Sequence, residues 1–298
     1  MPAGDKSPGV LLRKRRRLGA ELRRLREQSG MSGRQLAEQI GISQSKVSRI
    51  ESGTALPTLA QVTDWATATG SSQGATSAAM ALADAAYTDV HPWDLADRGQ
   101  SHLQGDIQEI EANSRAVLVY EPTLVPGLLQ TAEYARRVFS MFEPAYPEHV
   151  IPEVTVSRLD RQTALFDPAR QFVFLVTEAA LRWLPGPPSL LLAQLDRITS
   201  VSTLGNVAIG VIPQSAQALT HVPHGFVMIE PADPEADALV LVETVHANLV
   251  VSDAGQVALY QRQWSLLEKM AAYGADARDL LSNIANDIRT IPQETPHE

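Results

Sequence analysis

The sequence predicts a multidomain protein with an all-α N-terminal domain and an α+β C-terminal domain. Within residues 1–70, short amphipathic stretches are separated by capping residues and glycines, as in a compact helical bundle. From Val117 onward, β-branched runs alternate with helical patterns, which favours a mixed body. The charge divides at the same place: residues 1–70 hold 12 Lys and Arg against 6 Asp and Glu, a net of +6, and the remainder has a net of −15. This asymmetry suggests a small DNA-facing head on a body with another task.

Four short helices are predicted in the N-terminal domain. The first runs from about Arg16 to Gln28, where leucines recur on one face, and it ends at Gly30. The second begins at the capping box Ser32-Gly33-Arg34-Gln35, and the fourth begins at a second capping box, Thr58-Leu59-Ala60-Gln61. Between them, Ser43 caps the third helix and Gly53 ends it.

The second and third of these helices have the spacing of a helix-turn-helix, in SGRQLAEQIGISQSKVSRIES at residues 32–52. Ala37 is small where the two helices would cross, and Gly41 allows the left-handed conformation that a tight turn requires. Apolar residues on either side are expected to hold the helices together. The predicted packing residues are Leu36, Ala37, Gly41, Ile42, Val47 and Ile50.

The segment QLAEQIGISQSKVSRIESG resembles the XRE type of helix-turn-helix, found in phage-repressor-like regulators, over about residues 15–70. The resemblance implies that Gln44, Ser45, Lys46 and Arg49 reach bases or phosphates in the major groove. Their chemistry agrees, because glutamine pairs bidentately with adenine and arginine with guanine. The alternatives are a surface salt bridge for Arg49 and a merely exposed position for Gln44. Gly33 stands where family members often carry glutamine, so a side-chain contact is lost there.

Contacts to the DNA backbone are expected around the start of the second helix and in the basic run before the first. Ser32 and Arg34 lie where helix N-termini favour anions, and Ser48 is expected either to face a phosphate or to be inert. Glu51 is expected to bond within its own domain, because it would repel phosphates. The basic run is interpreted as a phosphate clamp or minor-groove arm, with a solubilising tail as the alternative. It comprises Arg13, Lys14, Arg15, Arg16 and Arg17.

The chain is expected to divide into four parts. They are the DNA-binding domain (1–72), an alanine-rich linker passing into a helix (73–102), the α+β domain (103–290) and a disordered tail (291–298). Strands are predicted at 117–120, 172–177, 207–212, 226–229, 239–243 and 248–251, and helices at 103–112, 128–142, 154–166, 190–201, 256–272 and 277–288. The last three strands suggest an antiparallel meander, whereas the earlier strands are compatible with either direction of pairing.

The C-terminal region also resembles a known group, in YEPTLVPGLLQTAEYARRVF, RLDRQTALF, LVTEAALRWL, LLAQLDRI and VAIGVIP. These segments are similar to the C-terminal domain of actinobacterial, antitoxin-like XRE regulators, over roughly residues 105–288. Members are commonly encoded beside a very small protein with which they are thought to act. The resemblance therefore implies a small protein partner encoded nearby.

Six residues of this region are candidates for binding a partner or ligand: Gln130, Arg158, Arg161, Glu178, Arg182 and Trp183. Arg158 and Arg161 share a helical face, which would either meet an acidic partner or pair with nearby acids. Glu178, Arg182 and Trp183 would either edge a pocket or form a surface ion pair with ordinary packing.

Several classes of function are disfavoured. The absence of cysteine excludes disulfides and thiolate chemistry, and a cytoplasmic location is expected. No stretch is apolar enough for a membrane helix, and the start of the chain lacks the apolar core of a signal peptide. The pair His221 and His224 is not expected to bind metal, because no helix fixes its geometry. Without a phosphate-binding glycine loop or a hydrolase motif, no enzyme and no cofactor are predicted.

The favoured interpretation is a one-component transcriptional regulator that binds double-stranded operator DNA as a homodimer, because one helix-turn-helix reads one half-site. The C-terminal domain would then mediate dimerisation and the response to a small protein or ligand. One alternative is an antitoxin that sequesters a small neighbouring-gene protein and autoregulates its operon. A second alternative is an enzyme with a DNA-targeting head.

Overall fold

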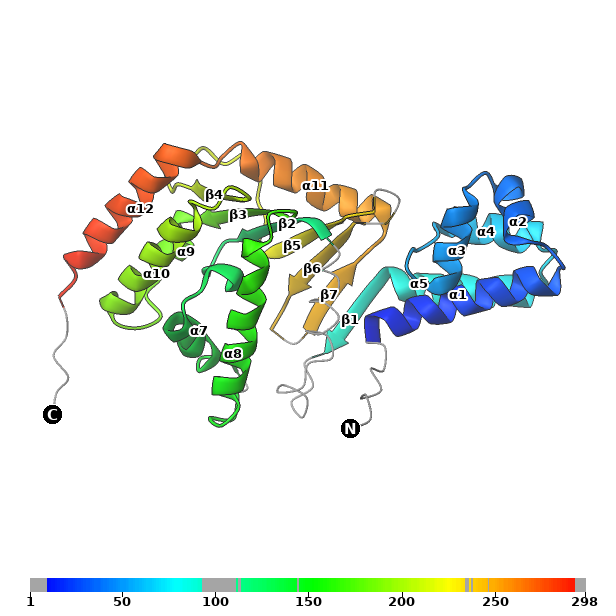
Figure 1. Ribbon diagram of the computed structural model, residues 1–298, viewed down its shortest axis with the longest axis horizontal. Helices are drawn as coiled ribbons and strands as arrows, with labels where there is room; N and C mark the ends of the chain where they lie inside the picture. The colour runs from blue at the N-terminus through cyan, green and yellow to red at the C-terminus, as the bar shows by residue number, and fades with distance from the viewer. Residues whose placement is uncertain are drawn as a thin grey trace. The chain divides into compact units, whose positions relative to one another are not determined.

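The computed structural model forms two compact units (Figure 1). It describes residues 10–92, 111, 114–143, 145–233, 236, 238–245 and 247–292. The first unit combines the N-terminal helices with a later piece of the chain, and it comprises Met1–Pro92, Ser101–Asn113 and Glu230–Ala258. The second unit comprises Trp93–Gln100, Ser114–Ile229 and Leu259–Glu298. The predicted helix at 103–112 lies outside the described residues apart from Glu111, and so does most of the predicted tail.

The N-terminal helices form a bundle within the first unit. They are α1 (Val10–Gln28), α2 (Gly33–Ile40), α3 (Gln44–Ser52), α4 (Leu59–Ala68) and α5 (Gln73–Tyr87). Both capping boxes form: the Ser32 hydroxyl accepts from the amide of Gln35, and Thr58 does the same for Gln61. The core of the bundle is apolar around the fully buried Trp65, whose indole N–H donates to the carbonyl of Leu22 at 3.0 Å.

Two features of the bundle differ from the sequence prediction. Helix α1 begins at Val10 rather than at about Arg16. The alanine-rich stretch expected as a linker passing into a helix is helical as α5 from Gln73, and its Ala79, Ala83 and Ala86 belong to the same core as α1–α4. Alanine allows this close approach of helices, so α5 is a fifth helix of the bundle.

Three strands of the first unit pair antiparallel, in the order β1-β7-β6. These are β1 (Thr88–Pro92), β6 (Leu239–Glu243) and β7 (Ala247–Val251). β6 and β7 form the expected hairpin, with Val242 opposite Leu249. Within the part expected as a linker and helix, 73–102, residues 88–92 instead form a strand, because β1 pairs with β7 along the whole of Thr88–Pro92. Pairing to a distant strand overrides the weak local propensity of these polar residues.

The strands of the second unit lie in the order β5-β2-β3-β4. They are β2 (Ser114–Glu121), β3 (Gln171–Thr177), β4 (Val207–Ile212) and β5 (Phe226–Pro231). The last two residues of β5 belong to the first unit. β2 and β4 each pair parallel to β3, which settles the direction that the sequence left open. Phe174 lies opposite Val119 on one side and Ile209 on the other, and it is fully buried.

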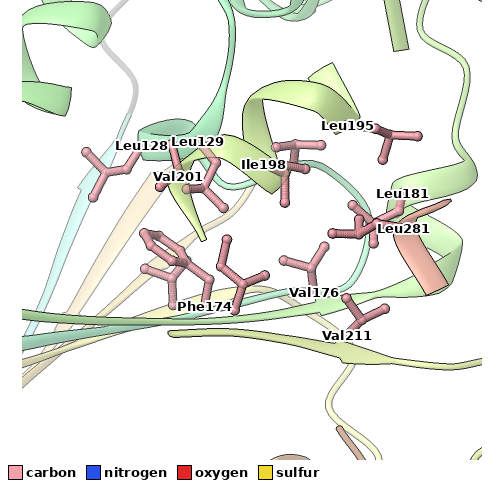
Figure 2. Packing of buried hydrophobic residues seen from close by; sticks show 14 of the residues in the cluster. Leu128, Leu129, Phe174, Val176, Leu181, Leu195, Ile198, Val201, Val211 and Leu281 are labelled. Carbon is pink, nitrogen blue, oxygen red and sulfur yellow. The ribbon is translucent and has the colours of Figure 1, made fainter. Parts of the chain in front are cut away.

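Helices cover both faces of these parallel strands. One face packs on η1 (Gly127–Leu129), α7 (Ala132–Phe139), η2 (Gln162–Phe166), α9 (Glu178–Arg182), α10 (Pro188–Val201) and α12 (Gly274–Arg289). Figure 2 shows the centre of this core, where Leu195 and Ile198 of α10 point toward Val176 of β3. On the other face, α11 (Ala254–Glu268) places Tyr260 and Trp264 against Phe226. Helix α8 (Ile151–Arg161) packs beside α7.

The helix expected over 128–142 is interrupted. Thr131 has extended backbone angles and caps α7, so that η1 and α7 are separate turns. In the described part of the chain, none of the helices has the length and apolar character needed to cross a bilayer.

Candidate nucleic-acid interface

The α2-turn-α3 unit has the geometry that a helix-turn-helix requires. Gly41 ends α2 in the left-handed region at φ 70° and ψ 33°, and its amide donates to the carbonyl of Ala37. Ser43 then caps α3 by accepting from the amide of Lys46 at 3.0 Å. Of the expected packing residues, Leu36, Ala37, Val47 and Ile50 are buried, and Ile42 packs on the same core at partial exposure.

Two glycines allow α3 to lie close to α1: Gly53, which the sequence predicted as the end of the third helix, and Gly19, which the sequence did not indicate. A Cβ at Gly19 would lie 2.8 Å from the carbonyl oxygen of Glu51 and closer still to that of Ile50. Gly53, at φ 79°, ends α3 where a Cβ would lie 2.8 Å from the backbone nitrogen of Arg16. The backbones of α1 and α3 therefore touch directly, and α1 fixes the position of the helix expected to read DNA.

An ion pair joins the same two helices. The Arg26 guanidinium binds the Glu51 carboxylate through two bonds, Nε to Oε1 at 2.5 Å and Nη2 to Oε2 at 2.9 Å, and Nη1 donates to the carbonyl of Met31. Both side chains are largely covered, at 13% and 11% exposure. The bond to Glu51 raises the pKa of Arg26. The expectation that Glu51 bonds within its own domain is met by this pair.

The residues expected to read bases differ in how available they are. Gln44, Ser45 and Ser48 are exposed on α3, and Lys46 is half-buried. Arg49 is only 16% exposed, and its Nη1 forms an ion pair with Oδ2 of Asp233, a residue that follows β5. The salt bridge considered as the alternative for Arg49 is therefore present, and its partner is 184 residues away in the sequence.

The residues expected to contact phosphates also divide into different environments. The basic run lies within α1, where Arg16 and Arg17 are exposed and Lys14 is half-buried. Arg15 is only 7% exposed, which disfavours its predicted part in a phosphate clamp or minor-groove arm. The physical reason is helical spacing: Arg15 shares the inward face with Leu18 and Leu22. The side chain of Arg13 lies outside the described residues.

At the start of α2, the two predicted phosphate contacts are on the surface. Ser32 is exposed, and its hydroxyl is occupied by the capping box with Gln35 at 2.9 Å. Arg34 is 83% exposed and pairs with Glu38 one turn later at 3.1 Å. An exposed pair of this kind is weak enough to open when a phosphate competes for the guanidinium.

In the second unit, Gln130 and Arg158 form an internal link. Gln130 is 2% exposed; its amide nitrogen donates to the carbonyl of Val125, and its oxygen accepts from Nη1 of Arg158 at 2.8 Å. The Arg158 guanidinium lies 4.3 Å from the ring centre of Phe139. The buried Gln130 is therefore satisfied within the fold, which disfavours its predicted role in binding a partner or ligand, whereas that role of the half-buried Arg158 stays a prediction. Arg161 is half-buried on the same helix.

Two buried glutamines complete this link: Gln194, which the sequence did not indicate, and Gln162, which was expected on the same helical face as Arg158 and Arg161. Gln194 of α10 is fully buried; it accepts from the amide of Thr131 at 2.8 Å and donates to the carbonyl of Leu129 at 2.7 Å. Gln162 donates to the carbonyl of Gln130 at 2.7 Å. Together these side chains satisfy the backbone of the turn between η1 and α7, which explains the polar residues in an otherwise apolar region.

Glu178 and Arg182 form the ion pair anticipated as one alternative. They pair along α9 at 2.7 Å, Arg182 also binds Asp287 of α12 at 2.9 Å, and Glu178 accepts from the amide of Gln214 at 2.9 Å. The pKa of Glu178 lies below its ordinary value of 4.5, chiefly because of the Gln214 amide and then of Arg182. Trp183 is partly exposed beside them, at 38%.

This depressed pKa predicts an acid-sensitive contribution to stability. Because the folded carboxyl has the lower pKa, its contribution is present above about pH 4.5 and is lost as the pH falls through the folded value. Glu178→Gln is expected to lower the unfolding temperature at pH 7 and to converge with the wild type toward pH 3, as measured by circular dichroism. The control Glu133→Gln, at a 70% exposed surface pair, should keep the wild-type pH dependence. If the unfolding temperature of Glu178→Gln depended on pH as steeply as that of the wild type, the acid-sensitive contribution would not come from Glu178.

The capped turn, the buried interhelical core and the exposed first turn of α3 define the class of the N-terminal region as a helix-turn-helix DNA-binding domain. In agreement, the family described as "Helix-turn-helix domain" matches residues 17–79. The family described as "Domain of unknown function (DUF5753)" matches residues 104–283, which is more than half of the chain, and the chain belongs to this family. No curated protein matches the chain.

Proposed function

We propose that this protein is a sequence-specific, one-component transcriptional regulator of the XRE type, and that α3 enters the major groove of operator DNA. The observation that carries the proposal is the first turn of α3, where Gln44 and Ser45 are exposed directly after the capped turn and Lys46 lies beside them. Glutamine and lysine are suited to base edges and phosphates there. The net charge of +6 over residues 1–70 supports an anionic partner for this domain.

We propose further that the protein binds as a homodimer. One helix-turn-helix covers a single half-site, and the acidic remainder of the chain, with a net charge of −15, disfavours binding of a lone head. The C-terminal domain is proposed to supply the dimer contact. This role is tested by sedimentation of the full chain with operator DNA: two chains per operator are expected, and a complex with one chain would remove it.

The C-terminal domain is also proposed to receive the signal, from a small protein encoded nearby or from a ligand. A pocket of about 240 Å³ between β4 and α12, beside Tyr273 and Arg278, supports the ligand, although it is smaller than the roughly 300–1,000 Å³ of most ligand sites. Burial raises the pKa of Tyr273 to about 12, so its hydroxyl is protonated at neutral pH. No catalytic role is proposed, and the regulator would act in the cytoplasm.

The proposal is tested by selecting bound fragments from random DNA with the full-length protein, then titrating the selected site with variants. Gln44→Ala is expected to weaken binding to that site by about 1–3 kcal/mol and to relax the preference at one base pair. Arg17→Ala, at an exposed site on α1, is the matched control. It should lower the affinity for all DNA sequences alike and reduce the salt dependence of binding by the equivalent of about one phosphate contact.

Selection that enriches no sequence would remove the proposal. Recovery of a small protein with the native regulator would favour the antitoxin function, particularly where that protein alters operator binding.

A further inference from the structure

One contact in the first unit joins the proposed DNA-reading helix to an acidic segment that is distant in the sequence. Nη1 of Arg49 forms an ion pair with Oδ2 of Asp233. Asp233 follows β5, and it belongs to the same compact unit as α3. The Arg49 side chain is 16% exposed while that of Asp233 is 51% exposed, so the arginine is the more enclosed partner of the pair.

The partner of Arg49 distinguishes it from other arginines of the bundle. Arg23, Arg24, Arg26 and Arg34 each pair with an acid of α1, α2 or α3. These pairs are internal to the bundle, and some of them stabilise it directly. The pair of Arg49 is instead supplied by the segment that links β5 to β6, so it couples the groove-facing surface of α3 to another part of the unit.

The chemistry of that segment is anionic. Residues 232–238 read ADPEADA, with carboxylates at Asp233, Glu235 and Asp237. The chain contains neither Lys nor Arg from Ile198 to Gln261. By its sequence the segment carries negative charge without a cation of its own, and Asp233 pairs with Arg49 of α3.

A carboxylate on Arg49 occupies the hydrogen-bonding positions that a guanine edge or a phosphate oxygen would use. Arginine presents a planar set of donors that suits any of these acceptors. Arg49 lies one turn after Ser45 and so faces the same side of α3 as the exposed first turn. DNA that contacts this face must therefore displace Asp233 or leave Arg49 unused.

We propose that Asp233, which follows β5, is an autoinhibitory residue that holds Arg49 and lowers the affinity for operator DNA until it is displaced. This inference rests on the proposed function of α3 as the DNA-reading helix. It assigns Asp233 a regulatory role: a signal that moves β5 or β6 would change the availability of Arg49.

The test is an operator-binding titration with the full chain. Asp233→Asn is expected to bind the selected site about fivefold more tightly than the wild type. This factor corresponds to the upper end of the free energies that exposed ion pairs contribute. Glu243→Gln is the matched control, because it removes one negative charge at the exposed end of β6, which the same segment leads into. An equal gain in the control would show general electrostatic repulsion and overturn the proposal.

A second arm tests whether the effect passes through Arg49. In the Arg49→Ala background, Asp233→Asn should leave the affinity unchanged, and any gain there would contradict the proposal. If Asp233→Asn binds the operator only as tightly as the wild type, the autoinhibitory role is removed while the proposed function stands.

A third measurement does not depend on DNA. Arginine modification by phenylglyoxal, followed by peptide mass spectrometry, compares Arg49 with the exposed Arg34 as an internal standard. Arg49 is expected to be protected in the wild type and to react several-fold faster in Asp233→Asn. Equal reactivity in both proteins would show that the ion pair does not form in solution, whatever the outcome of the DNA experiments.

Discussion

Gly19→Ala is expected to destabilise the helix-turn-helix by about 3 kcal/mol, the upper range for overpacking a well-packed core, and to weaken operator binding at least tenfold. The added methyl group would lie 2.8 Å from the carbonyl oxygen of Glu51 and closer to that of Ile50. Both obstacles are backbone atoms, so no side-chain rotation relieves the contact. Helix α3 must move away from α1, which displaces Gln44 and Lys46 together.

The matched control is Gly74→Ala, which makes the same change in α5 of the same bundle. A Cβ at Gly74 meets nothing within 4 Å in the described structure, so this variant should gain about 0.5–1 kcal/mol from helix propensity alone. Amide hydrogen exchange of peptides covering α3 measures both effects in the full chain. Equal protection in the two variants would show that α1 and α3 are not in close contact.

The glycine contact shows what the sequence can and cannot reveal here. The helix-turn-helix was predictable because its signals are local: Ser32, Gly41 and Ser43 cap and turn the chain by contacts within a few residues. Gly19 gives no such signal, because a glycine in a helix looks like a weak position unless the neighbouring helix is known. Strands β4 and β6 were predicted at their observed ends for the same local reason, since their apolar runs have clear limits.

The polar residues that the sequence did not place in the core share one cause, which is that their burial depends on the tertiary fold. Arg15 lies on the inward face of α1, and Gln194 sits among the leucines of α10, where it satisfies the backbone of a distant turn. Neither burial is visible without the tertiary fold. Strand β1 was missed because its pairing partner, β7, is about 160 residues away. The acid that pairs with Arg49 is 184 residues away in the sequence. The sequence could therefore indicate an acidic partner for Arg49, but not which residue it is.

Removal of the Glu51 carboxylate is the second change expected to have a large effect. Glu51→Ala removes the bidentate partner of Arg26, whose side chain is 13% exposed in the wild type, and loss of one member of a buried pair costs about 3–5 kcal/mol. Because both groups retain some solvent contact, a value near 3 kcal/mol is expected. Hydrogen exchange of α1 and α3 should report the loss, with Glu38→Gln, at the 68% exposed surface pair, as an unaffected control.

A double-mutant cycle separates the ion pair from other consequences of truncation. Arg26→Ala also removes a bond to the carbonyl of Met31, so it should destabilise the bundle on its own. The double variant should then be less destabilised than the sum of the single variants, since neither charge remains uncompensated. Additive effects would contradict a direct pair. The Arg26–Glu51 pair is expected to orient α3 without contacting bases. Its loss should therefore lower the affinity for all DNA sequences equally, in contrast to the loss of Gln44.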